Sequence, residues 1–145
     1  MRFMVIAKAN AESEKEGALP DPLFMADMNK YIDELINAGV MQGYEGLHPS
    51  SKGARVHFSG KNRTVIDGPF AETKELIAGY MLWQVKSLQE AIEWVKRSPN
   101  PDAGESEVEI RQVFEPEDFA PAFSEQDIQQ EKQIRAQLAE QAAKK

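Results

Sequence analysis

The chain lacks cysteine altogether and has only two histidines among its 145 residues. Without thiols it forms no disulfide bond, no thiolate nucleophile and no cysteine zinc site. The two histidines stand apart, without the His-x-x-x-His or His-x-His spacing of metal ligands. The Gly-x-Gly-x-x-Gly motif, the Walker loop and the Gly-x-Ser-x-Gly motif are missing as well. We therefore expect no metal ion and no cofactor.

Basic residues are outnumbered, because 17 Lys and Arg face 24 Asp and Glu and leave a net charge of −7. Nucleic-acid backbones bind basic faces, so we expect no nucleic-acid partner. Long hydrophobic runs are missing too, since the apolar residues 3–7 are too few for a signal peptide or a membrane span. These features predict a cytoplasmic protein with no membrane partner, and the length suits one domain with a modest core.

The first part of the chain predicts a strand, a loop and a helix. Residues 3–7 are typical of a strand buried on both faces, and the charged residues 10–19 indicate an exposed, mobile loop. A helix begins at the N-cap Asp21 with Pro22 in its first position, and it ends at Gly39. Its apolar residues recur at helical spacing: Phe24, Met28, Tyr31, Ile32 and Leu35.

The next part of the chain predicts a hairpin. Residues 40–47 contain two glycines, which favours an irregular strand or a bulge. Residues 55–58 alternate polar and apolar side chains as a half-buried strand does, and after a turn at residues 59–62 the strand of residues 63–67 returns. The sequence leaves the pairing register of this hairpin open.

The second half predicts a strand, a helix and a last strand. Residues 79–85 are again apolar on both faces. Ser87 and Glu90 form a capping box that begins a helix, and residues 107–113 alternate as a strand does. The expected buried stripe of the helix comprises Leu88, Ala91, Ile92 and Val95.

The order strand, helix, hairpin, strand, helix, strand predicts an α+β sandwich of the ferredoxin-like type. We expect this domain to span residues 1–115. Pro116 and Pro121 mark a linker, and residues 124–145 form an appended helix that either docks on a partner or frays. Residues 116–145 are thus an extension with a thin apolar stripe: Ile128, Ile134 and Leu138.

The two central strands favour a homodimer. Two helices cover one face of a small sheet, yet residues 3–7 and 80–85 are apolar on both faces. A second copy placed sheet to sheet removes the other face from water, which is worth roughly 1.5–3 kcal/mol for each large side chain buried. Two-fold dimers are also the commonest assembly. The alternative is that the C-terminal helix folds over the open face.

The second strand of the hairpin leads into a distinctive motif. The β-branched residues 64–66 precede Asp-Gly-Pro-Phe at residues 67–70 and Ala-Glu-Thr-Lys-Glu at residues 71–75. This string resembles the signature of the DGPF branch of the YCII-related family, and residues 46–50 resemble its Gly-Leu-x-Pro-Ser stretch. The resemblance covers roughly residues 1–113 by layout, and it implies a dimeric α+β barrel.

Asp67 and His48 are the candidate acid and base. Asp67 ends a strand, where a carboxylate can be partly buried, or it is a turn residue that accepts backbone N–H bonds. His48 is a candidate general acid/base, or a loop histidine that caps a turn. His57 alternates with Val56 and Phe58 and therefore faces away from them, on the surface or toward a second copy.

Other polar residues border the same strand end. Arg55 and Arg63 can hold an anionic substrate, whereas the acid–base cluster at residues 72–75 also suits a solvated turn. We predict a mouth that binds a small molecule and is composed of Tyr44, Glu45, Arg55, Phe70, Glu72 and Lys74.

The chain departs from the wider YCII-related group at one point. Some members of that group resemble enzymes with a histidine in the first helix that pairs with an aspartate as an acid/base dyad. Residues 21–38 contain no histidine and carry Met25 and Met28 instead. We therefore do not assign that dyad to this chain. His48 and Asp67 are the pair that could replace it.

Three functions stay open from the sequence. The first is a small enzyme or ligand-binding protein with an acid/base pocket. The second is a non-catalytic regulatory module, because DGPF-type domains resemble partners of transcription regulators such as sigma factors. The third is a purely structural dimer. The sequence names no substrate.

Overall fold

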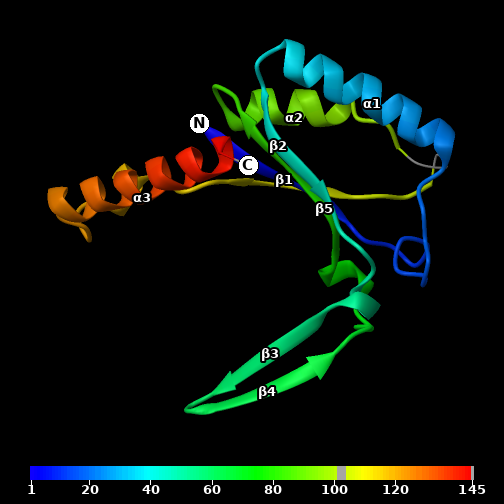
Figure 1. Cartoon of the computed structure of the whole chain (residues 1–145). Helices are drawn as coiled ribbons and strands as arrows, with labels where there is room; N and C mark the ends of the chain where they lie inside the picture. The colour runs from blue at the N-terminus through cyan, green and yellow to red at the C-terminus, as the bar shows by residue number, and fades with distance from the viewer. Residues whose placement is uncertain (101–103, 145) are drawn as a thin grey trace. The chain divides into compact units, whose positions relative to one another are not determined.

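The computed structural model describes residues 1–100 and 104–144, and it divides into two compact units, Met1–Gln112 and Val113–Lys145 (Figure 1). Single turns of 3-10 helix, η1 (Ser50–Lys52) and η2 (Thr73–Glu75), flank a β-hairpin in the first unit. The strands and α-helices described in the first unit are β1 (Arg2–Lys8), α1 (Pro22–Asn37), β2 (Met41–Gly46), β3 (Ala54–Ser59), β4 (Asn62–Asp67), β5 (Ile77–Gln84), α2 (Leu88–Lys96) and β6 (Val108–Gln112).

Four strands form the main sheet in the order β2-β5-β1-β6. Each neighbouring pair is antiparallel, and the helices α1 and α2 follow β1 and β5 in the chain. This is the ferredoxin-like α+β fold, so the predicted fold class is confirmed. The β3–β4 hairpin is inserted between β2 and β5 and forms a sheet of its own.

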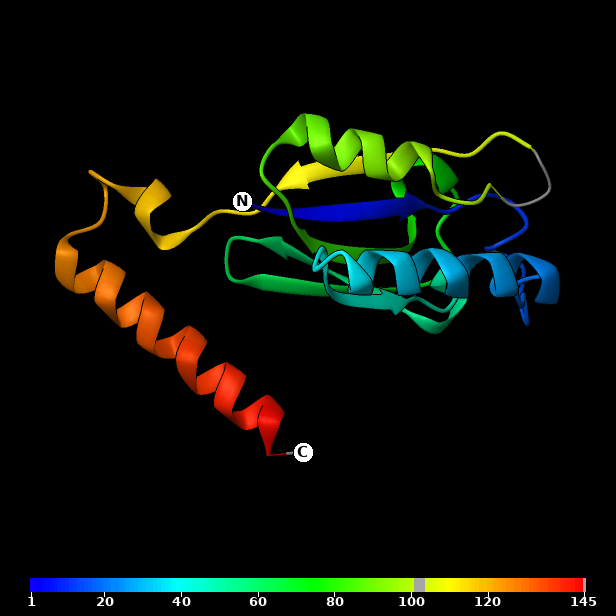
Figure 2. The same ribbon diagram turned by 90° about the horizontal axis from the view of Figure 1, so that it is seen from above.

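The core lies between the sheet and the two helices, which cover the same face (Figure 2). Phe3 pairs with Trp83 across β1 and β5, and Val5 lies on the same face two residues further along β1. These side chains pack with Leu35 of α1 and Ala91 of α2, and all five are buried. The first face of the sheet is therefore shielded from water within one chain.

Helix α1 has the predicted ends. Asp21 is the N-cap, although its side chain makes no capping hydrogen bond, and Gly39 follows the helix with a left-handed φ of 74°. The hydroxyl of Tyr31 donates a hydrogen bond to the carbonyl oxygen of Trp94 in α2 at 2.6 Å. This bond joins the two helices above the sheet.

Helix α2 differs from its prediction in two respects, the partner of Glu90 and the burial of Leu88. The Ser87 hydroxyl accepts the N–H of Glu90 at 3.1 Å, as a capping serine does. The Glu90 carboxylate accepts the N–H of Lys86 at 2.8 Å, one residue before the N-cap. The expectation that Leu88 is buried was wrong, because this first residue of the helix lies beyond the core and is exposed.

The irregular strand that the glycines indicate is β2. Its register against β5 shifts between Met41 and Gly43, which is the predicted bulge. Further along β5, a Cβ at Gly79 would lie 2.8 Å from the carbonyl oxygen of Glu45. The β2 backbone therefore approaches β5 too closely for a side chain at this position.

The hairpin is confirmed, and the structure settles its register. Val56 pairs with Val65 and Phe58 with Arg63, while Gly60 takes a left-handed φ of 58° in the turn. His57 lies on the opposite face, as expected. The expectation of a half-buried strand was wrong, because every residue of β3 and β4 is exposed. The alternation of polar and apolar residues along a strand shows which side chains share a face. It does not show whether another element covers that face.

The second unit contains η4 (Pro116–Phe119) and α3 (Glu125–Ala143). Its aromatic residues stack in series, with ring centroids 5.0 Å apart for Phe114 and Phe119 and 4.7 Å apart for Phe119 and Phe123. The predicted helix at residues 124–145 is present, and its last residue lies outside the described part of the chain. Among the described residues no helix has the length and apolarity needed to cross a bilayer.

Candidate functional site

The candidate site lies at the base of the hairpin, where Ser50 joins three segments. Its hydroxyl donates a hydrogen bond to a carboxylate oxygen of Glu14 at 2.5 Å, and its N–H donates to the same carboxylate at 3.1 Å. The hydroxyl oxygen also accepts the N–H of Phe70 at 3.0 Å. Ser50 thus ties the loop after β1 and the turn after β4 to η1. Glu14, Ser50, Gly68 and Phe70 are called the hairpin junction below.

Gly68 closes the hairpin junction through its backbone. Its N–H donates to the carbonyl oxygen of Gly53 at 3.0 Å, and its bond to Pro69 is cis. A Cβ at Gly68 would lie 1.7 Å from the carbonyl oxygen of Ser50. Any side chain would therefore force η1 and the turn apart, so the glycine of the Asp-Gly-Pro-Phe motif has a direct packing role.

Phe70 supplies the aromatic face of the site. The guanidinium carbon of Arg55 lies 3.9 Å from the centroid of the Phe70 ring. This is a cation–π contact between a hairpin strand and the turn that ends the hairpin. Arg55 is exposed and Phe70 half-buried, so the pair presents a cation and an aromatic ring at the surface.

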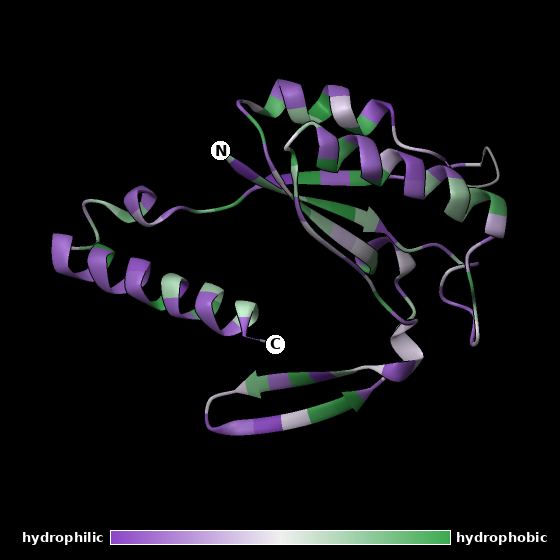
Figure 3. Ribbon diagram, turned by 45° about the horizontal axis from the view of Figure 1, so that its top comes forward, coloured by the Kyte–Doolittle hydropathy of each residue, from purple (hydrophilic) through white to green (hydrophobic). Residues whose placement is uncertain are grey.

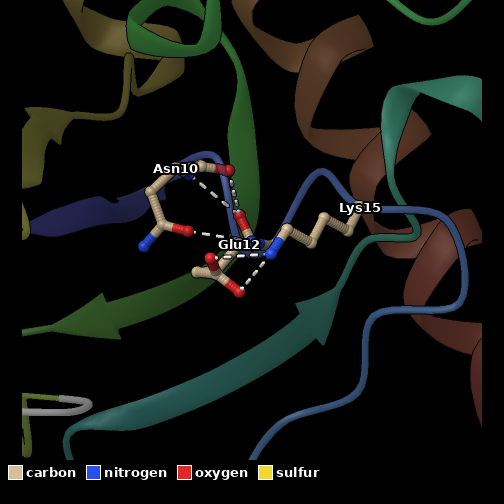
Figure 4. Close-up of polar contacts among 4 residues, drawn as sticks. Asn10, Glu12 and Lys15 are labelled. Atoms are coloured by element: carbon tan, nitrogen blue, oxygen red, sulfur yellow. Dashed lines mark hydrogen bonds and ion pairs between the residues drawn. The ribbon is translucent and has the colours of Figure 1, made fainter.

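The loop that carries Glu14 is held by short-range bonds (Figure 4). The Asn10 side chain accepts the N–H of Ser13 at 2.8 Å, and the Lys15 ammonium lies 2.9 Å from a carboxylate oxygen of Glu12. The loop is irregular, as predicted, but these turns and the bond from Ser50 tie it down. Glu14 is therefore presented to η1 from an organised loop.

The two proposed titrating residues lie apart from these bonds. Asp67 is the last residue of β4, pairs with Ala54 across the hairpin, and is exposed. The expectation of a partly buried carboxylate was wrong, because the side chain at this strand end is exposed. His48 is exposed in the loop before η1. Among the described residues no hydrogen bond or ion pair joins His48 to Asp67.

The remaining predicted residues do not form one cluster. Tyr44 pairs with Met81 and Glu45 with Tyr80, so the two side chains leave opposite faces of β2. Glu72 and Lys74 are exposed at η2, where the Glu72 carbonyl oxygen accepts the N–H of Glu75 at 3.0 Å. This geometry matches the alternative of a solvated turn.

Sequence reasoning missed the two residues with the strongest polar contacts. Ser50 stands in the Gly-Leu-x-Pro-Ser stretch, which was the signal available for it. The sequence held no signal for Glu14. It lies in a loop with several other carboxylates, and its partner Ser50 is 36 positions away along the chain.

Within the described residues, no three His, Asp or Glu side chains are grouped as metal ligands. A shallow, open hollow is found in the second unit, beside the first turn of α3. Glu125, Gln126, Ile128 and Gln129 line it.

Fold and junction together define an α+β protein with a ferredoxin-like sheet and an inserted hairpin arm. The YCII-related domain matches residues 1–115, and the chain belongs to that family. The chain is also similar to R00369, an uncharacterized protein of Rhizobium meliloti (strain 1021). The two are 32% identical over 98 residues, which cover 66% of this chain and 79% of the relative.

Proposed function

We propose that the protein is a homodimer that binds a small aromatic anion at the hairpin junction, with Asp67 and His48 as acid and base. The observation that carries this proposal is the Arg55–Phe70 pair. A guanidinium beside an aromatic ring offers charge to a carboxylate and a flat apolar face to a ring. Asp67 ends the neighbouring strand, where it pairs with Ala54, so its side chain leaves the face of the hairpin opposite Arg55.

The mouth of this site is open within one chain. Tyr44, Glu45, Glu72 and Lys74, the residues predicted for the mouth, are all exposed. A second copy supplies the wall that excludes water, since no described element of the first unit covers the open face of the main sheet or the hairpin. As part of the same proposal, the protein belongs to the DGPF branch of its family and is located in the cytoplasm.

Benzoate is the probe that tests this function, because it combines a carboxylate for Arg55 with a ring for Phe70. Isothermal titration calorimetry should detect its binding to the wild-type protein. Arg55→Gln and Phe70→Leu should each weaken that binding about tenfold or more, because the first removes the charge that meets the carboxylate and the second the aromatic face. His57→Ala removes an exposed histidine and should bind benzoate normally. Unaltered binding in the first two variants contradicts their roles, and no binding to the wild type contradicts the ligand class.

A second candidate function is a regulatory module that docks through its C-terminal unit. Exposed apolar side chains of that unit favour it: Phe114, Phe123, Ile134 and Leu138. Transcription regulators such as sigma factors are the partner class. Removing the residues after Pro121 should weaken binding to such a regulator and leave the dimer intact. Equal binding by the shortened and full chains contradicts this function.

A further inference from the structure

One face of the β3–β4 hairpin is apolar and fully open to solvent. The register places Val56, Phe58 and Val65 on the same face, with 51%, 65% and 65% of their surface exposed. Arg63 lies on this face too, with its guanidinium carbon 4.2 Å from the Phe58 ring centroid. Figure 3 shows the corresponding hydrophobic bands along both strands. Three large apolar side chains together on an isolated hairpin mark an interaction surface rather than scattered surface residues.

The hairpin does not bury this face within its own unit. It projects beneath the main sheet and away from it, on the side opposite α1 and α2 (Figure 1). All twelve residues of its strands are exposed. An isolated two-stranded hairpin is at best marginally stable in water, so this arm needs a surface to pack against.

The main sheet has a matching face, which no described element of the first unit covers. Pairing aligns Glu45, Tyr80, Ile6 and Glu109 in one row across β2, β5, β1 and β6. Leu82 and Met4 stand beside this row on the same face. The centre of the open face is therefore apolar, with Glu45 on β2 and, on β6, Glu109 ion-paired to Arg111 and Lys8.

The geometry points to a second copy of this chain as the occupant: each hairpin packs its Val56, Phe58 and Val65 face across the open sheet of its partner. This inference rests on the homodimer proposed above and assigns the contact that builds it. In a two-fold dimer the exchange is reciprocal, so both arms and both sheets are covered at once.

Charge and size favour this occupant. Residues 54–67 carry three Lys or Arg and one Asp, a net charge of +2, whereas the whole chain carries −7. The rest of the chain therefore carries −9, and on the open face Glu45 of β2 is a carboxylate that Arg63 of the arm can meet. A six-residue strand is about 20 Å long, and a four-stranded sheet is about 14 Å wide between its outer strands. The arm is long enough to cross the sheet.

Val65→Glu and Thr64→Glu form a matched pair of tests, because adjacent residues of β4 receive the same charge on opposite faces. In sedimentation analysis of the full chain, Val65→Glu should raise the dimer dissociation constant about 100-fold. Thr64→Glu should leave that constant within about threefold of wild type. A dimer that tolerates Val65→Glu overturns the arm exchange but not the homodimer, whereas a monomeric wild type overturns both. Neither result depends on benzoate binding.

Cysteine pairing tests the contact itself, since the natural chain has no thiol background. Chains carrying Val56→Cys alone and Tyr80→Cys alone should form a mixed disulfide dimer when oxidised together. A chain with both substitutions should cross-link between molecules. An intrachain disulfide in that chain means that the arm folds onto its own sheet and overturns the inference. Full accessibility of both thiols to a maleimide probe overturns it as well.

Discussion

Gly68 and Ser50 lie in direct backbone contact at the base of the hairpin. The space beside the Gly68 Cα is filled by the Ser50 carbonyl group, which would stand 1.7 Å from an added Cβ. Gly68 therefore sets the distance at which η1 meets the turn after β4. The contact explains why glycine stands in the middle of the Asp-Gly-Pro-Phe motif.

Gly68→Ala should lower the free energy of unfolding by about 3 kcal/mol, because the methyl group overpacks a rigid backbone contact. Chemical denaturation followed by circular dichroism measures this loss. Gly46→Ala is the control, since a Cβ there meets nothing within 4 Å. Equal stability of the two variants contradicts the close contact.

Ser50→Ala should cost about 1–3 kcal/mol of unfolding free energy, because it leaves Glu14 and the Phe70 N–H without their partner. The neighbouring Ser51 is exposed, so Ser51→Ala is the matched control and should change the stability by less than about 0.5 kcal/mol. Proteolysis in the loop of residues 10–19 should also become faster in Ser50→Ala alone. If both alanine variants are equally stable, Ser50 does not organise the junction.

Tyr31 should make the fold sensitive to alkali. Desolvation by burial raises the pKa of its hydroxyl well above the ordinary value of about 10, with Glu34 adding to the rise and Arg97 opposing it. The folded state therefore keeps a proton that the unfolded state releases, so the stabilisation is present below about pH 10 and is lost as the pH rises further. Denaturation curves recorded from pH 8 to pH 11 check this.

The matched variant for this titration is Tyr31→Phe, which keeps the ring and removes the hydroxyl. It should lose about 1 kcal/mol at neutral pH, because the bond to the Trp94 carbonyl oxygen is gone. The decline above about pH 10 should be shallower than in the wild type. If the free energy of unfolding declines equally in both proteins, groups other than Tyr31 cause the sensitivity to alkali.

Acid should loosen the start of α3. Hydrogen bonds from the Ser124 N–H and hydroxyl to the Asp127 carboxylate hold the pKa of that carboxyl below its ordinary value. Their contribution is present above about pH 3.9 and disappears as the pH falls through the lower folded pKa. The protection factors of the amides in the first turn, which are corrected for the intrinsic exchange rate at each pH, should fall over that interval. Ser124→Ala should exchange rapidly at every pH, and a protected first turn in this variant contradicts the capping role.

Local signals were enough to predict most of the fold. Asp21, Pro22 and Gly39 delimit α1 because caps act within a few residues, and alternating side chains gave the hairpin. The predicted burial of Leu88 was wrong, because the spacing of apolar residues along a helix does not show how far the sheet beneath that helix extends. The predicted half-burial of the hairpin was wrong for a similar reason. Polar and apolar residues alternate in the same way whether or not another surface covers the apolar face.

The site was predictable only where a motif marked it. Gly68 and Phe70 belong to a recognisable string, and the structure gives both a contact at the junction. Glu14 was invisible because its partner is reached through the tertiary fold rather than along the chain. The burial expected for Asp67 is absent within one chain, since a strand end is shielded only if another surface reaches it.

The stacked rings of Phe114, Phe119 and Phe123 give the C-terminal unit a nucleus of its own. Each ring contacts the next, so replacing Phe119 should release both of its neighbours at once. The middle ring is therefore the position at which this unit tolerates substitution least.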